Sequence, residues 1–346
     1  MKKIKINMYS EADKVEGQGV GSAYKEQVGI VGSIPEFEMS INGKHKNSYD
    51  IRHFHTVSPK FYFDIKKNRI NVCYVHFIPV YDDGSLHMPK FAFNVYRWYV
   101  LKFYNKNDEL VVVNPYFIHE LEKNGIDPKK VTYIPNYVSK DNFFKMKDSE
   151  INEIKKKYAI PLDRFIVLGV GQTQTRKGVL DFIEVAKKNP SMYFVWAGGF
   201  SFGKLTAGYE EIKKAIDNPP SNVKFIGIIP RTEMNGVYNL ANVLFLPSYQ
   251  ELFPMTILEA VNLHTPLLLR NLDLYEDILL HDYVKGANND DFSRLLHEYQ
   301  TNKDFYKKGE LISKNISDYY SKENITKLWK DYYTKIYNKY PNKHAN

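Results

Sequence analysis

Short runs of β-branched and aromatic residues alternate with longer helical stretches along the chain, and this alternation restricts the fold more than any other feature. Runs of this length and composition are typical of strands in a parallel sheet that is buried on both faces. The first predicted strands are 4–8, 49–55, 70–77, 110–113 and 131–134. The later ones are 165–170, 193–197, 223–226, 243–246 and 266–269. This order predicts two doubly wound α/β domains.

A polar, lysine-rich stretch at residues 139–157 separates the two sets of strands and predicts an interdomain connection with one helix. We therefore expect a first domain over residues 1–160, a second over 161–320, and a C-terminal helix over 321–346. A chain of 346 residues is long enough for each domain to bury its own core. In domains of this kind ligands bind at the carboxyl ends of the strands, so we expect the site in the cleft between the domains.

Composition excludes several classes of protein. The chain is 43% hydrophobic, which argues against disorder, and it contains one cysteine, so no disulfide framework is expected. No run of 18 apolar residues is present, and the N-terminus is too polar for a signal peptide, so we expect a cytoplasmic protein that does not cross a membrane. The net charge is +8, mostly from the first half, but no nucleic-acid-binding motif accompanies it. We expect no nucleic-acid partner.

Two glutamates with seven residues between them, Glu251 and Glu259, bracket the predicted start of a helix. Pro254 suits the first helical position because its missing N–H would be unpaired there. The backbone near Met255 and Thr256 would then present unpaired N–H groups to a phosphate. Glu259 would lie about 7–8 Å along the helix, so the two acids would contact opposite ends of one elongated ligand. A nucleotide diphosphate sugar has such a shape.

A basic pair, Arg176 and Lys177, follows the first strand of the second domain and precedes a predicted helix at 179–187. A guanidinium and an ammonium at a strand end can neutralise a diphosphate and stabilise it as a leaving group. A pair of this kind is also common on solvated surfaces. The pattern alone leaves both interpretations open.

The stretch from Pro247 to Ala260 resembles, nearly position by position, the donor-site signature of retaining glycosyltransferases of family 4. The resemblance implies an α/β fold of the GT-B type, with two Rossmann-like domains facing across a cleft. It also implies that Glu251 binds donor-sugar hydroxyls, Glu259 the ribose, and Arg176 with Lys177 the diphosphate. Family members of this fold need no metal, and an Asp-x-Asp metal motif is absent, so we expect no cofactor.

Two histidines and a glycine-rich segment follow strands of the first domain. His76 matches a family histidine near the reacting sugar, which implies a catalytic role, although a histidine at a strand end is commonly structural. His55 is expected on the acceptor side, and with His53 it lacks a third ligand at a useful spacing for metal. Gly19 and Gly21 belong to a predicted loop that could approach the donor closely.

The stretch 89–106 combines seven aromatic residues with four basic residues and no acid. As a helix it would suit an anionic membrane surface, with Arg97, Trp98 and Lys102 among the contacting residues. A core helix packed on a sheet explains the same pattern equally well. Residues 327–340 form a second basic and aromatic helix, which resembles the family's C-terminal helix that returns to the first domain.

The opening 6–24, together with 75–79 and 133–139, is similar to bacterial glycolipid synthases that add a second hexose to glucosyl-diacylglycerol. This resemblance implies transfer of glucose or galactose from UDP-glucose or UDP-galactose to a glycolipid acceptor. It implies a lipoteichoic-acid anchor or membrane glycolipid as product, made by a peripheral protein on the inner face of the cell membrane. Alternatives are another acceptor such as a cell-wall or capsular intermediate, a glycoside hydrolase using both glutamates, and a non-catalytic membrane-docking protein.

Overall fold

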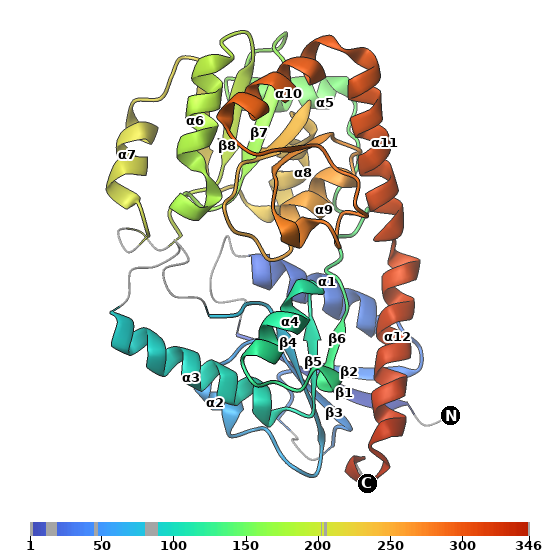
Figure 1. Cartoon of the computed structure of the whole chain (residues 1–346). Helices are drawn as coiled ribbons and strands as arrows, with labels where there is room; N and C mark the ends of the chain where they lie inside the picture. Colours follow the sequence, from blue (N-terminus) through green and yellow to red (C-terminus); the bar gives the residue numbers. More distant parts are fainter. Residues whose placement is uncertain are drawn as a thin grey trace. The chain divides into compact units, whose positions relative to one another are not determined.

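The computed structural model describes residues 3–11, 19–44, 48–79, 89–201, 203 and 206–344. The chain divides into two compact units (Figure 1). Unit 1 consists of Met1–Tyr81, Met88–Tyr137 and Tyr320–Asn346. Unit 2 consists of Asp82–His87 and Val138–Tyr319. The last segment of the chain therefore belongs to the same unit as the first.

Unit 1 is built on a parallel sheet with strand order β2-β1-β3-β4-β5-β6. Its strands are β1 (Ile4–Tyr9), β2 (Phe37–Ile41), β3 (Ile51–Phe54), β4 (Ile70–Val75), β5 (Glu109–Val112) and β6 (Val131–Tyr133). Its helices are α1 (Gly19–Gly32), α2 (Pro59–Tyr62), α3 (Lys90–Lys106), α4 (Tyr116–Lys123) and α12 (Lys322–Lys339). The strand order reverses between β1 and β3, which makes their carboxyl ends the expected ligand position.

Unit 2 contains a second parallel sheet with strand order β12-β11-β10-β7-β8-β9. Its strands are β7 (Ile166–Val170), β8 (Tyr193–Ala197), β9 (Val223–Gly227), β10 (Val243–Leu246), β11 (Leu267–Arg270) and β12 (Lys285–Gly286). Its helices are α5 (Asp148–Lys157), α6 (Val179–Lys188), α7 (Tyr209–Asp217), α8 (Arg231–Asn239), α9 (Met255–Val261), α10 (Asn289–Thr301) and α11 (Lys303–Tyr319). Here the order reverses between β7 and β10.

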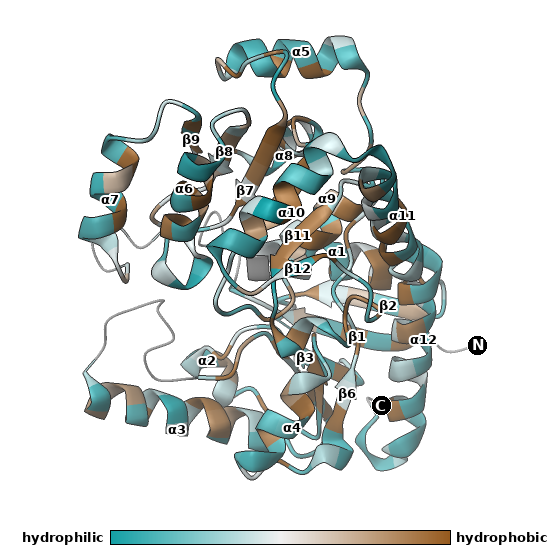
Figure 2. Ribbon diagram, turned by 45° about the horizontal axis from the view of Figure 1, so that its top comes forward, coloured by the Kyte–Doolittle hydropathy of each residue, from teal (hydrophilic) through white to brown (hydrophobic). Residues whose placement is uncertain are grey.

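Both sheets carry their apolar side chains on two faces. Every residue of β3, β4 and β7 is buried, as in strands that helices cover on both sides. In unit 2 the Phe182 ring lies edge-on to Trp196, with centroids 5.1 Å apart, and stacks with Phe245 at 5.7 Å. Figure 2 shows the hydrophobic colouring of the strands β7 and β11 between more hydrophilic helices.

The ten strands predicted from the sequence are all present, with ends that differ by up to two residues. Two strands were missed, β2 and β12. The β2 strand lies at a sheet edge and buries only Phe37, so its sequence lacks the continuous apolar run of an inner strand. The β12 strand has two residues. The unit boundary lies at Tyr137 and Val138, so the connection with α5, which we placed in the first domain, belongs to unit 2.

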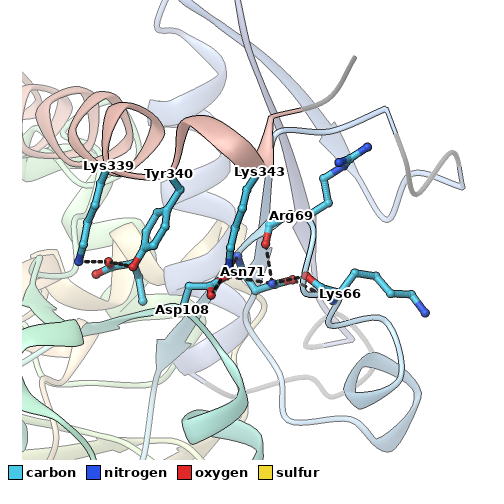
Figure 3. Close-up of polar contacts among 8 residues, drawn as sticks. Lys66, Arg69, Asn71, Asp108, Lys339, Tyr340 and Lys343 are labelled. Atoms are coloured by element: carbon cyan, nitrogen blue, oxygen red, sulfur yellow. Dashed lines mark hydrogen bonds and ion pairs between the residues drawn. The ribbon is translucent and has the colours of Figure 1, made fainter.

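A polar network connects the end of α12 to the rest of unit 1 (Figure 3). Lys339 Nζ lies 2.6 Å from Glu109 Oε1, and the Tyr340 hydroxyl donates to the same oxygen at 2.7 Å. Lys343 pairs with Asp108, which also accepts hydrogen bonds from the backbone and side chain of Asn71. Glu109 is 4% exposed, so its buried oxygens need these hydrogen-bond donors. The network holds the end of the helix against the amino ends of β4 and β5.

In the part of the chain that the structure describes, no helix is both long enough and apolar enough to cross a bilayer.

Candidate active site

Lys177 and Glu251 form a buried ion pair at the strand-order reversal of unit 2. The Lys177 Nζ lies 2.6 Å from Glu251 Oε1 and 2.7 Å from Oε2. The two side chains are 14% and 4% exposed. Lys177 comes from the loop after β7, and Glu251 comes from the loop after β10. The two predicted binding residues thus contact each other.

Close packing of the two loops brings this pair together. The Tyr249 N–H donates to the carbonyl of Arg176 at 2.8 Å. Gly178, the residue after Lys177, has a φ of +67°, and a Cβ at this position would lie 2.3 Å from the carbonyl oxygen of Pro247. Only glycine fits both the left-handed backbone and this close approach. The sequence Arg-Lys-Gly therefore has a structural reason for its glycine.

Burial and the neighbouring charges act in opposite directions on both members of the pair. Burial raises the pKa of the Glu251 carboxyl, but the positive charges of Lys177 and Arg176 outweigh burial and hold that pKa below its ordinary value. Burial also lowers the pKa of the Lys177 ammonium, against the opposing charge of Glu251. Glu251 is therefore a carboxylate at neutral pH, and it faces a cation that has lost most of its hydration.

Arg176 lies beside this pair and is half-buried. Its Nε donates to Gln174 Oε1 at 3.0 Å, and an η nitrogen donates to the carbonyl oxygen of Gln250 at 3.3 Å. These contacts orient the guanidinium within the loop that carries Lys177. The structure thus brings the adjacent residues Arg176 and Lys177 together with Glu251, which lies about 75 residues further along the chain.

The segment after Glu251 leads into α9, as predicted, but its first helical residue is Met255. Pro254 has an extended backbone, with φ −69° and ψ 126°, and serves as the preceding cap, so its expected place as the first helical residue is wrong. Met255 and Thr256 form the first turn, and Met255 is buried. The helix has seven residues, and Glu259 is the fifth of them.

Glu259 is buried and held by two donors from α8. An η nitrogen of Arg231 lies 2.6 Å from Glu259 Oε1, and the Tyr238 hydroxyl donates to Oε2. Burial raises the pKa of Tyr238, and the charge of Glu259 raises it further, so the phenol stays a neutral donor. Sequence reasoning missed Arg231 and Tyr238. No local pattern marks them, because the contacts span 28 and 21 residues and arise only when α8 packs on α9.

Three histidines gather at the carboxyl ends of β3 and β4 in unit 1. The ring centroids of His53 and His55 are 4.5 Å apart, and those of His55 and His76 are 5.8 Å apart. His53 Nδ1 lies 2.6 Å from the hydroxyl of Tyr333 on α12. Among the residues that the structure describes, both ring nitrogens of His55 and Nε2 of His76 are buried and have no hydrogen-bond partner. The structure thus places His76 and His55 together, as neighbours of the strand ends.

Burial keeps this histidine cluster neutral. It lowers the pKa of His53 and of His76 to about 3 in each case, and for His53 the nearby His76 adds to the effect. Burial and the two neighbouring imidazoles lower the pKa of His55 well below its ordinary value. Within the described residues, no group of three histidine, cysteine or acidic side chains has the arrangement of a metal site. Independence from metal remains a prediction.

The α3 helix buries one end and exposes the other. Its second half packs into unit 1 through Val100, Phe103 and Tyr104. Its first half exposes Phe91 and Trp98, which are 81% and 60% accessible. The two sequence interpretations, a core helix and an exposed one, therefore each describe one half. Figure 2 shows bands of both hydropathies along this helix.

One exposed stripe on α3 is apolar at its start and basic at its end. Phe91, Val95, Trp98 and Lys102 follow each other at helical spacing on one face, which we name the α3 stripe. Lys102 Nζ lies 5.0 Å from the Trp98 ring centroid. Arg97, which we expected on the membrane side, is exposed and donates to Asn124 Oδ1 beyond α4.

The glycine motif of unit 1 is only partly described. Gly19 and Gly21 lie in the first turn of α1, so this part is helical and the expected loop there is wrong. Gly17 and Gln18, which precede this turn, lie outside the described residues.

Comparisons with known sequences relate this chain to glycosyltransferases. The family model "Glycosyl transferases group 1" matches residues 150–319. The chain is 42% identical to alpha-galactosylglucosyldiacylglycerol synthase of Streptococcus pneumoniae (strain ATCC BAA-255 / R6) over 337 residues, which cover 96% of this chain and 90% of the relative. It is 27% identical to processive diacylglycerol alpha-glucosyltransferase of Acholeplasma laidlawii, over 86% of this chain and 90% of that one.

Solved structures with low sequence identity share the fold. The Anabaena protein HepE in complex with UDP-glucose superposes with a TM-score of 0.73 at 13% identity, covering 96% of this chain and 100% of that one. Sucrose-phosphate synthase from Thermosynechococcus elongatus has a TM-score of 0.73 at 15% identity, covering 97% and 99%. These likenesses confirm the predicted GT-B fold. The relative at 42% identity, which matches 96% of this chain, shows that the chain belongs to the glycosyltransferase family of the diglycosyl-diacylglycerol synthases.

Proposed function

We propose that this glycosyltransferase moves glucose or galactose from a UDP-sugar to a glucosyl-diacylglycerol acceptor, with retention at the anomeric carbon. The buried Lys177–Glu251 pair is the observation that carries the proposal. A buried ion pair is expensive to desolvate, and a cation beside a carboxylate at a strand-order reversal suits a ligand that contains both phosphate and hydroxyl groups. The names of both curated relatives include diacylglycerol, which supports a lipid acceptor.

Each residue of the site has a role in this proposal. A diphosphate would attract Lys177 and Arg176, and Glu251 would then accept hydrogen bonds from hydroxyls of the donor sugar. Glu259 would accept hydrogen bonds from the ribose. The N–H groups of Met255 and Thr256, which follow Pro254 in the first turn of α9, would add donors for phosphate. In unit 1, His76 would contact the donor sugar, His55 the acceptor, and the turn containing Gly19 and Gly21 the donor.

The proposed reaction exchanges one C–O bond for another and moves one proton. The acceptor hydroxyl oxygen bonds to the anomeric carbon while the bond from that carbon to the diphosphate oxygen breaks. Both events take place on the same face of the sugar, and the departing phosphate oxygen takes the acceptor's proton. Lys177 and Arg176 would stabilise the negative charge that develops on the diphosphate. No side-chain nucleophile is needed, and these cations supply the charge that a metal would otherwise provide.

Transfer assays test this function directly. Each nucleotide sugar, UDP-glucose or UDP-galactose, is incubated with vesicles that contain diacylglycerol or glucosyl-diacylglycerol, and UDP release and the lipid products are measured. We expect one donor to extend glucosyl-diacylglycerol to a diglycosyl lipid with retained configuration. Transfer only to a polysaccharide intermediate would change the acceptor, and the absence of UDP release with every acceptor would contradict the enzyme function.

We further propose that the α3 stripe contacts the anionic inner face of the cell membrane. Its exposed Phe91, Val95 and Trp98 would enter the interface while Lys102 meets lipid phosphates, as in helices that lie on a bilayer. Each exposed basic residue contributes about 1 kcal/mol near such a surface, and salt screens this contribution. Arg97 contributes less directly, because it is bound to Asn124.

A double substitution separates membrane contact from donor binding. Phe91→Ser with Trp98→Ser should weaken sedimentation with phosphatidylglycerol vesicles and slow transfer to lipid, while the affinity for UDP stays unchanged. Leu311→Ser is the matched control, because Leu311 is 57% exposed on α11 of unit 2. Unchanged sedimentation of the folded double variant would contradict the proposal for α3 and direct the search to the basic residues 327–339.

A further inference from the structure

Arg231 and Tyr238, which both belong to α8, hold the Glu259 carboxylate between them, and we call this arrangement the clamp. They are the first and eighth residues of α8, so seven positions, or about two turns, place them on the same face. Arg231 contacts Glu259 Oε1, and the Tyr238 hydroxyl contacts Oε2. Each carboxylate oxygen therefore has one protein donor, and the plane of the carboxylate is fixed.

A second layer of packing holds the clamp itself. The guanidinium carbon of Arg231 lies 5.1 Å from the ring centroid of Phe143, and the Tyr238 ring meets the same ring edge-on at 5.6 Å. Asn235, midway between the two on α8, accepts a hydrogen bond from the Phe144 N–H at 3.0 Å. The connection that precedes α5 thus fixes α8, and α8 fixes Glu259.

The clamp leaves part of the carboxylate's capacity unused. An ionised carboxylate offers about four lone-pair positions, and the two donors occupy one on each oxygen. Two vicinal hydroxyls of a ribose present two donors at a similar spacing. A carboxylate whose plane is already fixed loses little conformational freedom when it accepts them, so its preorganisation adds to affinity.

We infer that Arg231 and Tyr238 are positioning residues that make the donor site selective for a ribonucleotide over its deoxy analogues. The inference rests on the proposed binding of a UDP-sugar with its ribose at Glu259. A purely structural role would be to neutralise a buried acid, and Arg231, at 34% exposure, is sufficient for that without Tyr238. Two donors, one on each oxygen, are what orientation of the carboxylate requires.

Nucleotide discrimination tests this inference. The dissociation constants of UDP, 2′-deoxy-UDP and 3′-deoxy-UDP are measured by calorimetry for the wild type and for Arg231→Gln, Arg231→Lys and Tyr238→Phe. We expect the wild type to prefer UDP over at least one deoxy analogue by about tenfold or more, which is about 1.4 kcal/mol. This preference should fall to about threefold or less in Arg231→Gln and Tyr238→Phe, with partial recovery in Arg231→Lys.

The matched control is Glu233→Gln, because Glu233 lies on the same helix but pairs with Lys157 at the surface. It should keep the wild-type preference. Tyr238→Phe removes one oxygen and carries the test if an Arg231 variant fails to fold. Equal weakening of all three nucleotides in Tyr238→Phe, with the preference retained, would overturn the inference. A wild type that binds UDP without any preference would also overturn it, whereas a wild type that does not bind UDP would overturn the proposed function as well.

Discussion

The carboxyl ends of the strands carry opposite kinds of chemistry in the two units. In unit 2 they carry ionised side chains in pairs, Lys177 with Glu251 and Arg231 with Glu259. In unit 1 they carry buried imidazoles that are kept neutral, with aromatic neighbours such as Tyr74, whose ring centroid lies 4.4 Å from that of His76. The free-energy cost of burying polar groups is therefore reduced in two ways. In unit 2 opposite charges are paired, and in unit 1 the buried groups stay neutral.

This difference matches the two halves of a glycosyl transfer. A diphosphate brings negative charge and needs cations that are already in place. A sugar hydroxyl is neutral and would suit hydrogen-bonding atoms without a strong field, such as the imidazole nitrogens that have no partner among the described residues. The contrast between a charged and a neutral set of strand ends can be tested from either side.

The largest effect is expected from removing the cations of unit 2. Arg176→Ala with Lys177→Ala should reduce turnover at least a hundredfold, since losing donors to a leaving group costs about 3–4 kcal/mol in the barrier. UDP release at a saturating concentration of the donor measures this turnover. The matched control is Lys187→Ala with Lys188→Ala, at the exposed end of α6. Turnover near the wild-type level in a folded double variant would refute the role of this pair.

A stability measurement separates the charge of the pair from its packing. Glu251→Leu leaves Lys177 without its partner and should lower the free energy of unfolding by about 2–3 kcal/mol, less than for a fully buried pair because Lys177 retains some exposure. Glu251→Leu with Lys177→Met should recover most of that loss while transfer stays abolished. Urea unfolding measures both variants, and a double variant no more stable than the single one would contradict the explanation.

Mild acid should weaken unit 1 through its histidines. The folded-state pKa of His53 is about 3, below the ordinary 6.5, so the unfolded chain binds more protons as the pH falls below 6.5. The contribution of His53 to the free energy of unfolding is therefore fully present above pH 6.5 and is lost as the pH falls toward 3. At pH 5 the loss is about 2 kcal/mol.

Urea unfolding at pH 8 and pH 5 measures this loss. His53→Gln should make the difference between the two pH values smaller, whereas His297→Gln, on an exposed position of α10, should leave it unchanged. The same pH dependence in both variants would show that His53 does not contribute.

No effect is expected from chelation. Transfer should continue at the same rate in excess EDTA, because Arg176 and Lys177 supply positive charge at the diphosphate position. The assay with added manganese or magnesium after EDTA is the control. Loss of activity on chelation that either ion restores would show that unit 2 needs a metal in addition to its side chains.

The strands were predicted from local patterns, and the charged residues were selected by their resemblance to a family motif. Buried parallel strands are continuous apolar runs, and Arg176, Lys177, Glu251 and Glu259 lie in recognisable motifs. What the sequence did not predict are relations between distant residues. The contact of Lys177 with Glu251 depends on the close approach at Gly178, and the clamp on Glu259 depends on the packing of α8.

Helix ends and edge strands were also harder to predict than inner strands. The α12 helix begins at Lys322, one residue into the predicted range 321–346 and five residues before the basic and aromatic pattern at 327–340, where the Ser321 hydroxyl accepts a hydrogen bond from the Asn324 N–H. The first turn of α1 contains glycines, whose low helix propensity pointed to a loop. In both places, capping and packing outweighed intrinsic preference.

The fastening of the end of α12 to Asp108 and Glu109 has a consequence for biosynthesis. Unit 2 lies between two parts of unit 1 along the chain, so a ribosome completes Val138–Tyr319 before it makes Tyr320–Asn346. Domains generally fold as units during synthesis. The whole sequence of unit 2 is therefore available before unit 1 is complete. Until residues 320–346 have been made, His53 lacks its hydrogen-bond partner Tyr333, and α1 lacks the contact with α12.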